Sequence, residues 1–382
     1  MGCGAVGERT SESQRVTSSS GQVTPGMVLH VNAETTWRGG ENQVFQLARG
    51  MHRHHPCAVA CVPGSPLAQR LDAVGVPIHA IPGDRGLRAI LALRRVIRQA
   101  RPAMLHAHTS RAHQLCLLAA LGSRLPVAVT RRVDFPLKRG PLAGWKYRGA
   151  TVRFVAISLA IRDVLVTGGV PPQRIDVIPS GVDFTSLDAA ERRDPRAVFG
   201  LPADAQVVLN VAALSDHKDH ATLLRAWAGV EPGHPRAHLL IAGDGELRGD
   251  LERLITDLGL RRVYLVGYRD DVPGLMKGSD VFVMSSHLEG LCTSIMDAKR
   301  CGLPVVATRA GGIPEVIDGS SGGILVPVRD PLQLAHAIGV YLDDESRRAR
   351  DAEAARRDSD RFSASAMVRS YVDWYARQLA PV

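Results

Sequence analysis

One pattern repeats through most of the chain: a short run of Val, Ile, Leu and Ala, then a polar or glycine-bearing loop, then a longer amphipathic segment. The first apolar run starts at Met27, and further runs follow at residues 57–63 and 76–82. Continuous runs of this kind are typical of strands in a parallel sheet that helices cover on both faces. Residues 87–100 show strong helical periodicity, and Pro102 follows as a break. The alternation predicts a doubly wound α/β domain.

A second series of apolar runs begins after a polar, proline-bearing stretch at residues 183–204. It predicts a second parallel sheet, so we expect two facing Rossmann-like domains with a ligand-binding cleft between them. The last segment has apolar residues at helical spacing and predicts a terminal helix. The expected divisions are an N-terminal extension (1–25), a first domain (26–185), a second domain (186–360) and a C-terminal helix that packs back on the first domain (361–382).

Composition narrows the class of protein. The chain has 382 residues, of which 45% are hydrophobic, and it contains no apolar run long enough to predict a membrane span. The N-terminus lacks the apolar core of a secretory signal, and the six cysteines show no zinc-ligand spacing, so we expect reduced thiols in the cytoplasm. The net charge of +9 favours an anionic partner, such as a phosphorylated small molecule, an acidic membrane surface or nucleic acid. Only 4% of residues are aromatic, and no arginine-aromatic interleaving is visible, which argues against nucleic acid.

Residues 285–312 hold the most informative chemistry. Glu289 and Asp297 lie eight positions apart, with Gly290 and Thr293 between them, where a strand should give way to a helix. Gly290 permits a close backbone approach, and we expect Thr293 to cap the helix. A helix start with free N–H groups suits a diphosphate, and the two carboxylates suit sugar and ribose hydroxyls. The alternative is a solvated loop glutamate and an aspartate that merely complements the helix dipole.

The same segment resembles the donor-site motif of glycosyltransferase family 4, whose members have the GT-B fold. The family pattern is Ser-x-x-Glu-Gly, a second Glu eight residues after the first, and then Ala-x-x-x-Gly-x-Pro-Val. Asp297 stands where the family usually has the second Glu, and the resemblance extends over residues 27–375. The matching residues are Ser286, Glu289, Gly290, Ala298, Gly302, Pro304, Val305, Gly311, Gly312 and Glu315.

The resemblance assigns the second domain to the donor, a nucleotide-diphosphate sugar. It places Lys218 on the diphosphate, although Ala213 stands where the family usually has an arginine. Residues 241–248 resemble a turn that passes close to the nucleotide, and Gly267 and Tyr268 lie in a segment near the base. The donor-binding residues expected from the resemblance are Gly39, Gly40, Gly243, Gly267, Tyr268, Gly290, Leu291, Cys292, Thr293 and Asp297.

The first domain would bind the acceptor. Gly39 and Gly40 resemble the family's first glycine-rich loop, placed after the first strand and before its helix, where a plain turn is the alternative. His106 and His108 match the family's His-x-His strand end and share one face of the strand. By resemblance His108 points at the transferred sugar; a satisfied core histidine is the alternative. A two-histidine metal site has no carboxylate at ligand spacing, and the family's fold binds nucleotide sugars without a metal, so we expect neither a metal nor a cofactor.

The resemblance therefore implies a retaining glycosyltransferase with His108, Lys218 and Glu289 as catalytic residues and a glycan or glycolipid as acceptor. Arginines and lysines at residues 94–101 and 131–148 form a basic first domain that would suit an anionic lipid or a phosphorylated glycolipid; solvated helix faces are the alternative. We therefore expect a cytoplasmic enzyme, peripheral on the inner face of the plasma membrane, that takes part in the synthesis of lipopolysaccharide or another cell-envelope glycan. A sugar-nucleotide epimerase of the same architecture and a non-catalytic binding protein are the rival interpretations.

Overall fold

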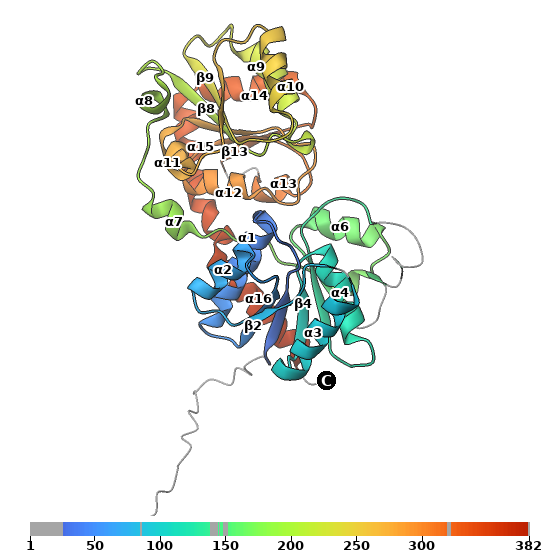
Figure 1. Ribbon diagram of the computed structural model, residues 1–382. Coiled ribbons are helices and arrows are strands. Elements are labelled where there is room, and N and C mark those ends of the chain that lie inside the picture. Colours follow the sequence, from blue (N-terminus) through green and yellow to red (C-terminus); the bar gives the residue numbers. More distant parts are fainter. Residues whose placement is uncertain are drawn as a thin grey trace, which may run out of the picture.

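The computed structural model describes residues 26–84, 86–137, 144, 146–147, 152–318 and 322–380. The expected N-terminal extension, residues 1–25, lies outside this part of the chain. The described residues form two α/β domains, one above the other in Figure 1. None of their helices combines the length and apolar character needed to cross a membrane.

The first domain is built on a seven-stranded parallel sheet in the order β3-β2-β1-β4-β5-β6-β7. Its central strands pair so that His30 of β1 lies beside His106 of β4. Each apolar run of the first half of the sequence forms one of these strands. The strands are β1 (Val28–Val31), β2 (Cys57–Cys61), β3 (Ile78–Ala80), β4 (Met104–Ala107), β5 (Val127–Arg131), β6 (Val152–Ala156) and β7 (Ile175–Val177).

The second domain is built on a six-stranded parallel sheet in the order β10-β9-β8-β11-β12-β13. The order reverses beside the first strand of the series, which is where open α/β sheets bind ligands at the carboxyl ends of their strands. The strands are β8 (Gln206–Val211), β9 (Ala237–Ala242), β10 (Val263–Gly267), β11 (Val281–Met284), β12 (Val305–Thr308) and β13 (Gly323–Val326).

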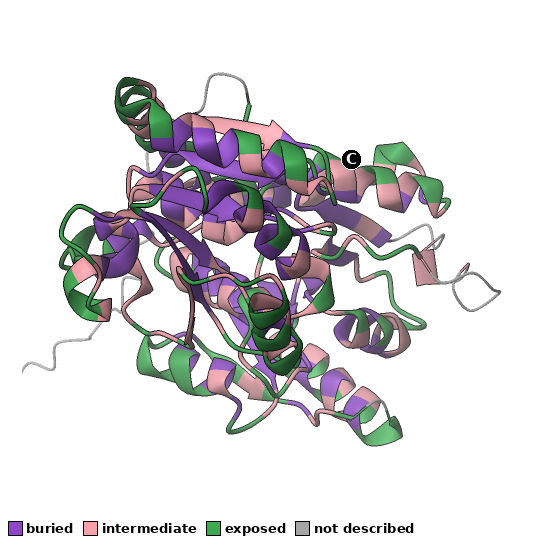
Figure 2. Cartoon of the chain, turned by 90° about the horizontal axis from the view of Figure 1, so that it is seen from above, coloured by how far each residue is buried: buried purple, intermediate pink, exposed green. Residues whose placement is uncertain are grey.

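Helices flank both sheets. Figure 2 shows buried strands at the centre and helices whose outer faces are exposed, which is the arrangement that the unbroken apolar strands require. The helices of the first half are α1 (Gly39–His52), α2 (Pro66–Ala73), α3 (Leu87–Ala100), α4 (Ser110–Ala120) and α6 (Leu159–Thr167). Those of the second half are α7 (Phe184–Ala189), α8 (Pro195–Phe199), α9 (His220–Val230), α10 (Arg248–Asp257), α11 (Val272–Gly278), α12 (Thr293–Arg300), α13 (Ile313–Val316), α14 (Pro331–Asp343), α15 (Glu345–Asp358) and α16 (Ala364–Leu379).

Helix α1 begins earlier than the sequence suggested. The glycine pair reads as a loop before the helix, but Gly39 and Gly40 are the first two residues of the helix itself. The Glu41 carboxylate accepts a hydrogen bond from the backbone N–H of Arg38 at 3.0 Å and so fixes the first turn. This local hydrogen bond overcomes the low helix propensity of glycine.

Helix α16 completes the first domain from the far end of the chain. Its residues Tyr371, Trp374 and Tyr375 are fully buried against α1 and the first sheet, and the helix lies beside α1 in Figure 1. The Trp374 indole N–H donates to Asp176 at 2.8 Å. The core of the first domain therefore includes side chains from both ends of the chain.

The two domains meet at small residues. A Cβ on Gly290 would lie 2.4 Å from the backbone oxygen of Arg132, so only glycine allows this approach. The Glu315 carboxylate accepts hydrogen bonds from the backbone N–H groups of Leu159 and Ala160 at 2.7 and 3.1 Å. A carboxylate of the second domain thus caps the start of α6 in the first, which favours a closed arrangement.

Replacing Trp374 tests the contribution of α16. We expect Trp374→Ala to lower the free energy of unfolding by about 3–5 kcal/mol, because it removes a fully buried ring and leaves a cavity. The measurement is urea unfolding followed by circular dichroism, with the exposed Arg377→Ala on the same helix as control. Equal midpoints for the two variants would show that the first domain does not depend on this helix.

Candidate functional site

The start of α12 offers unpaired backbone N–H groups at the domain boundary. Strand β11 ends at Met284, and the loop that follows leads to the helix at Thr293. Thr293 does not cap the helix, contrary to the expectation from sequence: it is the first helical residue, and Cys292 occupies the N-cap position with φ of 61°. Among the described residues, no side chain caps this helix start. The N–H of Ile295 bonds to the backbone oxygen of Cys292 at 3.2 Å, so the N–H groups of Thr293 and Ser294 are the ones able to bind an anion.

Glu289 lies in the loop before this helix and is held in place on several sides. Its backbone oxygen accepts from the N–H of Gly312 at 3.1 Å, and its side chain accepts from the Ser286 hydroxyl at 3.4 Å. The carboxylate also forms an ion pair with Lys218, and both side chains are less than one fifth exposed. The loop therefore presents a fixed carboxylate beside a fixed cation.

Lys218 ends a 3-10 turn at Asp216–Lys218 after β8, in the strand-loop segment that the resemblance identified. The Ser285 hydroxyl donates to its backbone oxygen at 2.9 Å, which joins this turn to the end of β11. Burial acts to lower the pKa of Lys218, but the neighbouring Cys292 and Glu289 outweigh that effect and raise it above its ordinary value. The side chain is thus a permanent cation at neutral pH.

Asp297 lies one turn inside α12. Its Oδ1 is buried and has no hydrogen-bond partner among the described residues. Desolvation raises the pKa of this carboxyl from 3.8 to about 7. Burial also raises the pKa of the Cys292 thiol to about 12, so this cysteine is uncharged. Leu291, next to it, is buried in the same core, which anchors the helix start.

Backbone geometry alone favours glycine at the ends of β9 and β10, at Gly243 and Gly267. A Cβ on Gly243 would lie 1.9 Å from the backbone oxygen of Ala212, and Gly243 has φ of 151°. Gly267 has φ of 73° and forms a bridge with Gly243. Tyr268, which follows it, is 76% exposed. The residues expected near the nucleotide base therefore form one surface beside β9 and β10.

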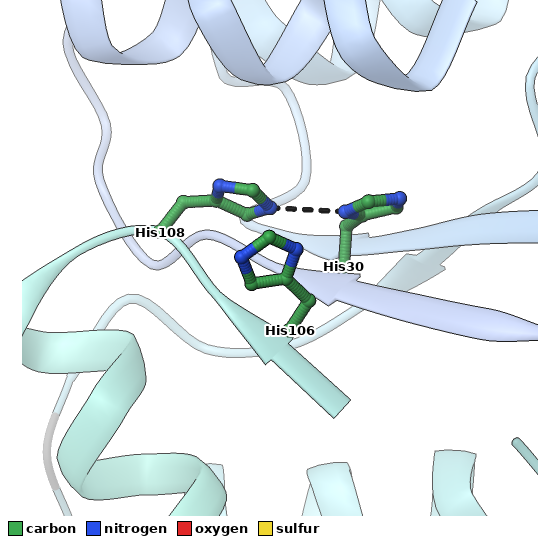
Figure 3. Close-up of side chains that lie close together, drawn as sticks. All are labelled: His30, His106 and His108. Carbon is green, nitrogen blue, oxygen red and sulfur yellow. Dashed lines mark hydrogen bonds between the residues drawn. The ribbon is translucent and has the colours of Figure 1, made fainter. Parts of the chain in front are cut away.

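Three buried histidines of the first domain lie together (Figure 3). His30 Nδ1 and His108 Nε2 are 2.9 Å apart, and the ring centroids of His106 and His108 are 4.1 Å apart. Burial is the main cause that lowers the pKa of all three, and that of His30 falls to about 3. They are neutral imidazoles at physiological pH.

The three nitrogens that come closest lie within 4.8 Å of one another, a spacing that could hold a metal ion. The donor set does not favour one. Both nitrogens of His106 already have partners, the hydroxyls of Tyr375 and Thr130. The charge of Arg132 also helps to lower the pKa of His106 and His108, so a second cation there would be repelled.

Sequence reasoning missed His30 and the role of Arg132. His30 is an ordinary member of an apolar strand in the sequence, and only the pairing of β1 with β4 brings it to His106. The structure gathers Lys218, Glu289, Cys292 and Asp297 in the second domain. His108, Gly39 and Gly40 belong to the first domain, where a Cβ on Gly40 would meet only the Arg132 side chain, at 4.0 Å.

Known proteins match this chain in both halves. The description "Glycosyltransferase Family 4" matches residues 37–186, and "Glycosyl transferases group 1" matches residues 191–358. The lipopolysaccharide core biosynthesis glycosyltransferase LpsE of Rhizobium meliloti is 36% identical to this chain over 183 residues. The matched segment makes up 47% of this chain and about half (53%) of the length of that relative.

Two further similarities extend over more of the chain. The UDP-Gal:alpha-D-GlcNAc-diphosphoundecaprenol alpha-1,3-galactosyltransferase of Escherichia coli is 26% identical over 75% of this chain and 79% of its own length. Anabaena HepE in complex with UDP superposes with a TM-score of 0.81 at 22% identity, over 92% of this chain and 100% of its own. The likeness to HepE shows the GT-B fold. Since the two family matches together span both domains, the chain belongs to the family 4 glycosyltransferases.

Proposed function

We propose that the protein transfers a sugar from a nucleotide-diphosphate donor to a hydroxyl of a glycan or glycolipid acceptor. One observation carries the proposal: the uncapped start of α12 lies beside the partly buried Lys218–Glu289 pair. Backbone N–H groups and a fixed ammonium together suit a diphosphate. The relatives support the donor class, since the name of one gives UDP-Gal and a solved neighbour holds UDP.

Each residue of the site has a task in this reaction. Lys218 and the first turn of α12 stabilise negative charge on the departing diphosphate. Glu289 accepts hydrogen bonds from the sugar, and Asp297 accepts them from the ribose diol. His108, across the cleft, orients the sugar. Tyr268 has the exposed ring that could cover a base.

We place the reaction among retaining transfers. The bond from the anomeric carbon to the donor phosphate oxygen breaks, and the bond from that carbon to the acceptor oxygen forms on the same face. The acceptor proton passes to the departing phosphate oxygen, so this route needs no separate protein base. The enzyme contributes orientation and charge stabilisation. Neither a metal nor a cofactor takes part in the proposal.

The acceptor that we propose is a cell-envelope glycan. The names of two relatives support it, one in lipopolysaccharide core synthesis and one acting on a sugar linked to diphosphoundecaprenol. A cytoplasmic location at the inner face of the membrane is the matching prediction. It can be checked by fractionation of cells that express the chain.

A thermal-shift screen of nucleotide sugars tests the function directly. A donor at about 100 times its Kd should stabilise the protein by ~2.7 kcal/mol, because it binds only the folded state. The donor that shifts the midpoint is then incubated alone, and the sugar is analysed. Recovery of an epimer without any acceptor would replace transferase activity with epimerase activity.

Removing the cation or the carboxylate should abolish most of the transfer. We expect Lys218→Ala and Glu289→Gln each to lower kcat by about 100-fold or more, the usual loss when a group that stabilises the transition state is removed. Arg225→Ala, an exposed cation on α9, is the matched control. Near-normal kcat in both variants, with thermal midpoints close to that of the parent, would mean that the chemistry lies elsewhere.

Asp297 predicts a pH dependence of stability. Its pKa is about 7 in the folded chain and near 3.8 when unfolded, so the folded state holds a proton that the unfolded state releases. The associated stability is complete below the unfolded pKa and is lost as the pH rises through about 7. Asp297→Asn should therefore gain stability relative to the parent as the pH rises from about 4 to about 7, and keep that gain above pH 7, as measured by urea unfolding. A constant difference between the two proteins would contradict the raised pKa.

A further inference from the structure

A cavity of about 390 Å³ lies in the first domain. It is formed where the carboxyl ends of β4 and β5 meet the starts of α1 and α4. His108, which the proposed function places on the transferred sugar, lines it. Its wall also includes Arg132, whose backbone oxygen abuts Gly290 of the donor domain. The cavity therefore adjoins the place where the sugar of a bound donor would lie.

The cavity carries a surplus of positive charge. Arg38, Arg131 and Arg132 line it, and Glu41 is the one carboxylate among its described lining residues. That carboxylate is already engaged, by the N–H of Arg38 at 3.0 Å and by the amide of Asn32 at 3.5 Å. Within the described residues, no carboxylate comes within 4.0 Å of any of the three guanidinium groups. Three cations therefore face one carboxylate that is already bound.

Several buried donors of the wall have no acceptor. The Nε and Nη2 atoms of Arg132 and the Nε of Arg131 are buried without a hydrogen-bond partner among the described residues. The partners Arg132 does have are neutral: Nη1 contacts the Ser180 hydroxyl at 3.4 Å, and the guanidinium also bonds to Tyr371. Burial lowers the pKa of both arginines, but a guanidinium stays charged in this range. A buried charged donor without an acceptor is costly, and an anion would relieve that cost.

Two neutral histidines and two helix starts complete the wall. His108 Nδ1 and His113 Nε2 have no partner among the described residues, and both side chains are at most 5% exposed. The 14-residue α1 and the 11-residue α4 direct their N-terminal ends toward the cavity through Gly40 and Ser110. The partial positive charge at both helix ends adds to that of the arginines.

We propose that this cavity is the acceptor site and that it binds a phosphate or diphosphate group carried by the acceptor, next to the hydroxyl that receives the sugar. The inference rests on the proposed function and names its acceptor class. A phosphate matches the charge, because its negative charges would pair with the guanidinium groups of Arg131 and Arg132, whose buried donors lack an acceptor among the described residues. Its oxygens also match the forked arrangement of arginine donors.

The acceptor could be a soluble sugar phosphate or a lipid-linked one, and the test separates the two. The protein is first saturated with the nucleotide that the thermal-shift screen identifies, so that the donor site is filled. It is then titrated calorimetrically, at constant ionic strength, with inorganic phosphate, with dodecyl phosphate micelles and with uncharged dodecyl maltoside micelles. Tighter binding of dodecyl phosphate than of inorganic phosphate identifies a lipid-linked acceptor, and equal binding identifies a soluble one.

Two variants probe the cavity. Arg131→Gln removes a charged donor, and Ser110→Asp adds a negative charge at the first position of α4, where an acid is favourable for the helix. Each should weaken the binding of both phosphate probes by at least about 10-fold, the loss of one charge-assisted hydrogen bond, and leave nucleotide affinity within about two-fold. Gln114→Glu is the control, since it adds the same charge one turn further along α4, on an exposed position.

The outcomes are distinct. Phosphate binding that both variants leave unchanged, or equal binding of dodecyl maltoside and dodecyl phosphate, would overturn the inference. If the parent protein binds no nucleotide, the proposed function is wrong instead. Phosphate binding that depends on Arg131 would still identify the cavity as an anion site in that case.

Discussion

The ion pair between Lys218 and Glu289 is the constraint on which the proposed donor site depends. Both groups are largely removed from water, and a partly buried charge is tolerated only with a close partner and additional hydrogen bonds. The Ser286 hydroxyl donates to the Glu289 carboxylate, and the Ser285 hydroxyl donates to the backbone oxygen of Lys218, so that the two serines fix the loop before α12. The uncapped helix start is thereby held beside a permanent cation. In the proposed site, a bound diphosphate would form an ion pair with Lys218 and accept hydrogen bonds from the free N–H groups of α12. The contacts that fix the geometry of the site would then also supply binding energy.

The two domains contribute different groups to the proposed site. The proposed donor side has one paired cation and backbone N–H groups, which suit a nucleotide diphosphate. Among the described residues, the proposed acceptor side has arginines without carboxylate partners and three neutral histidines. One contact between the sides joins backbone to backbone, at Gly290 against Arg132, and another joins the Glu315 carboxylate to the backbone N–H groups at the start of α6. Both contacts fix the position of one domain against the other.

Local patterns in the sequence predicted most of the fold. Each apolar run became a parallel strand, and the predicted helix at residues 87–100 is α3, because hydrophobic periodicity reports burial directly. Predictions about helix ends were weaker. Gly39 and Gly40 belong to α1 because Glu41 caps it, and Thr293 does not cap α12 because Cys292 adopts a left-handed conformation. Such ends are decided by individual hydrogen bonds and backbone angles, which residue types alone do not specify.

The sequence by itself determined the two-domain α/β architecture and the residues of the donor motif, since both are written in short contiguous segments. It also gave the excess of positive charge, but not its position. Only the tertiary structure decided that His30 joins His106 and His108, and that Arg131 and Arg132 line a cavity in which none of the described carboxylates pairs with them. These features join residues far apart in the chain. They depend on strand order and helix packing, which no local pattern encodes.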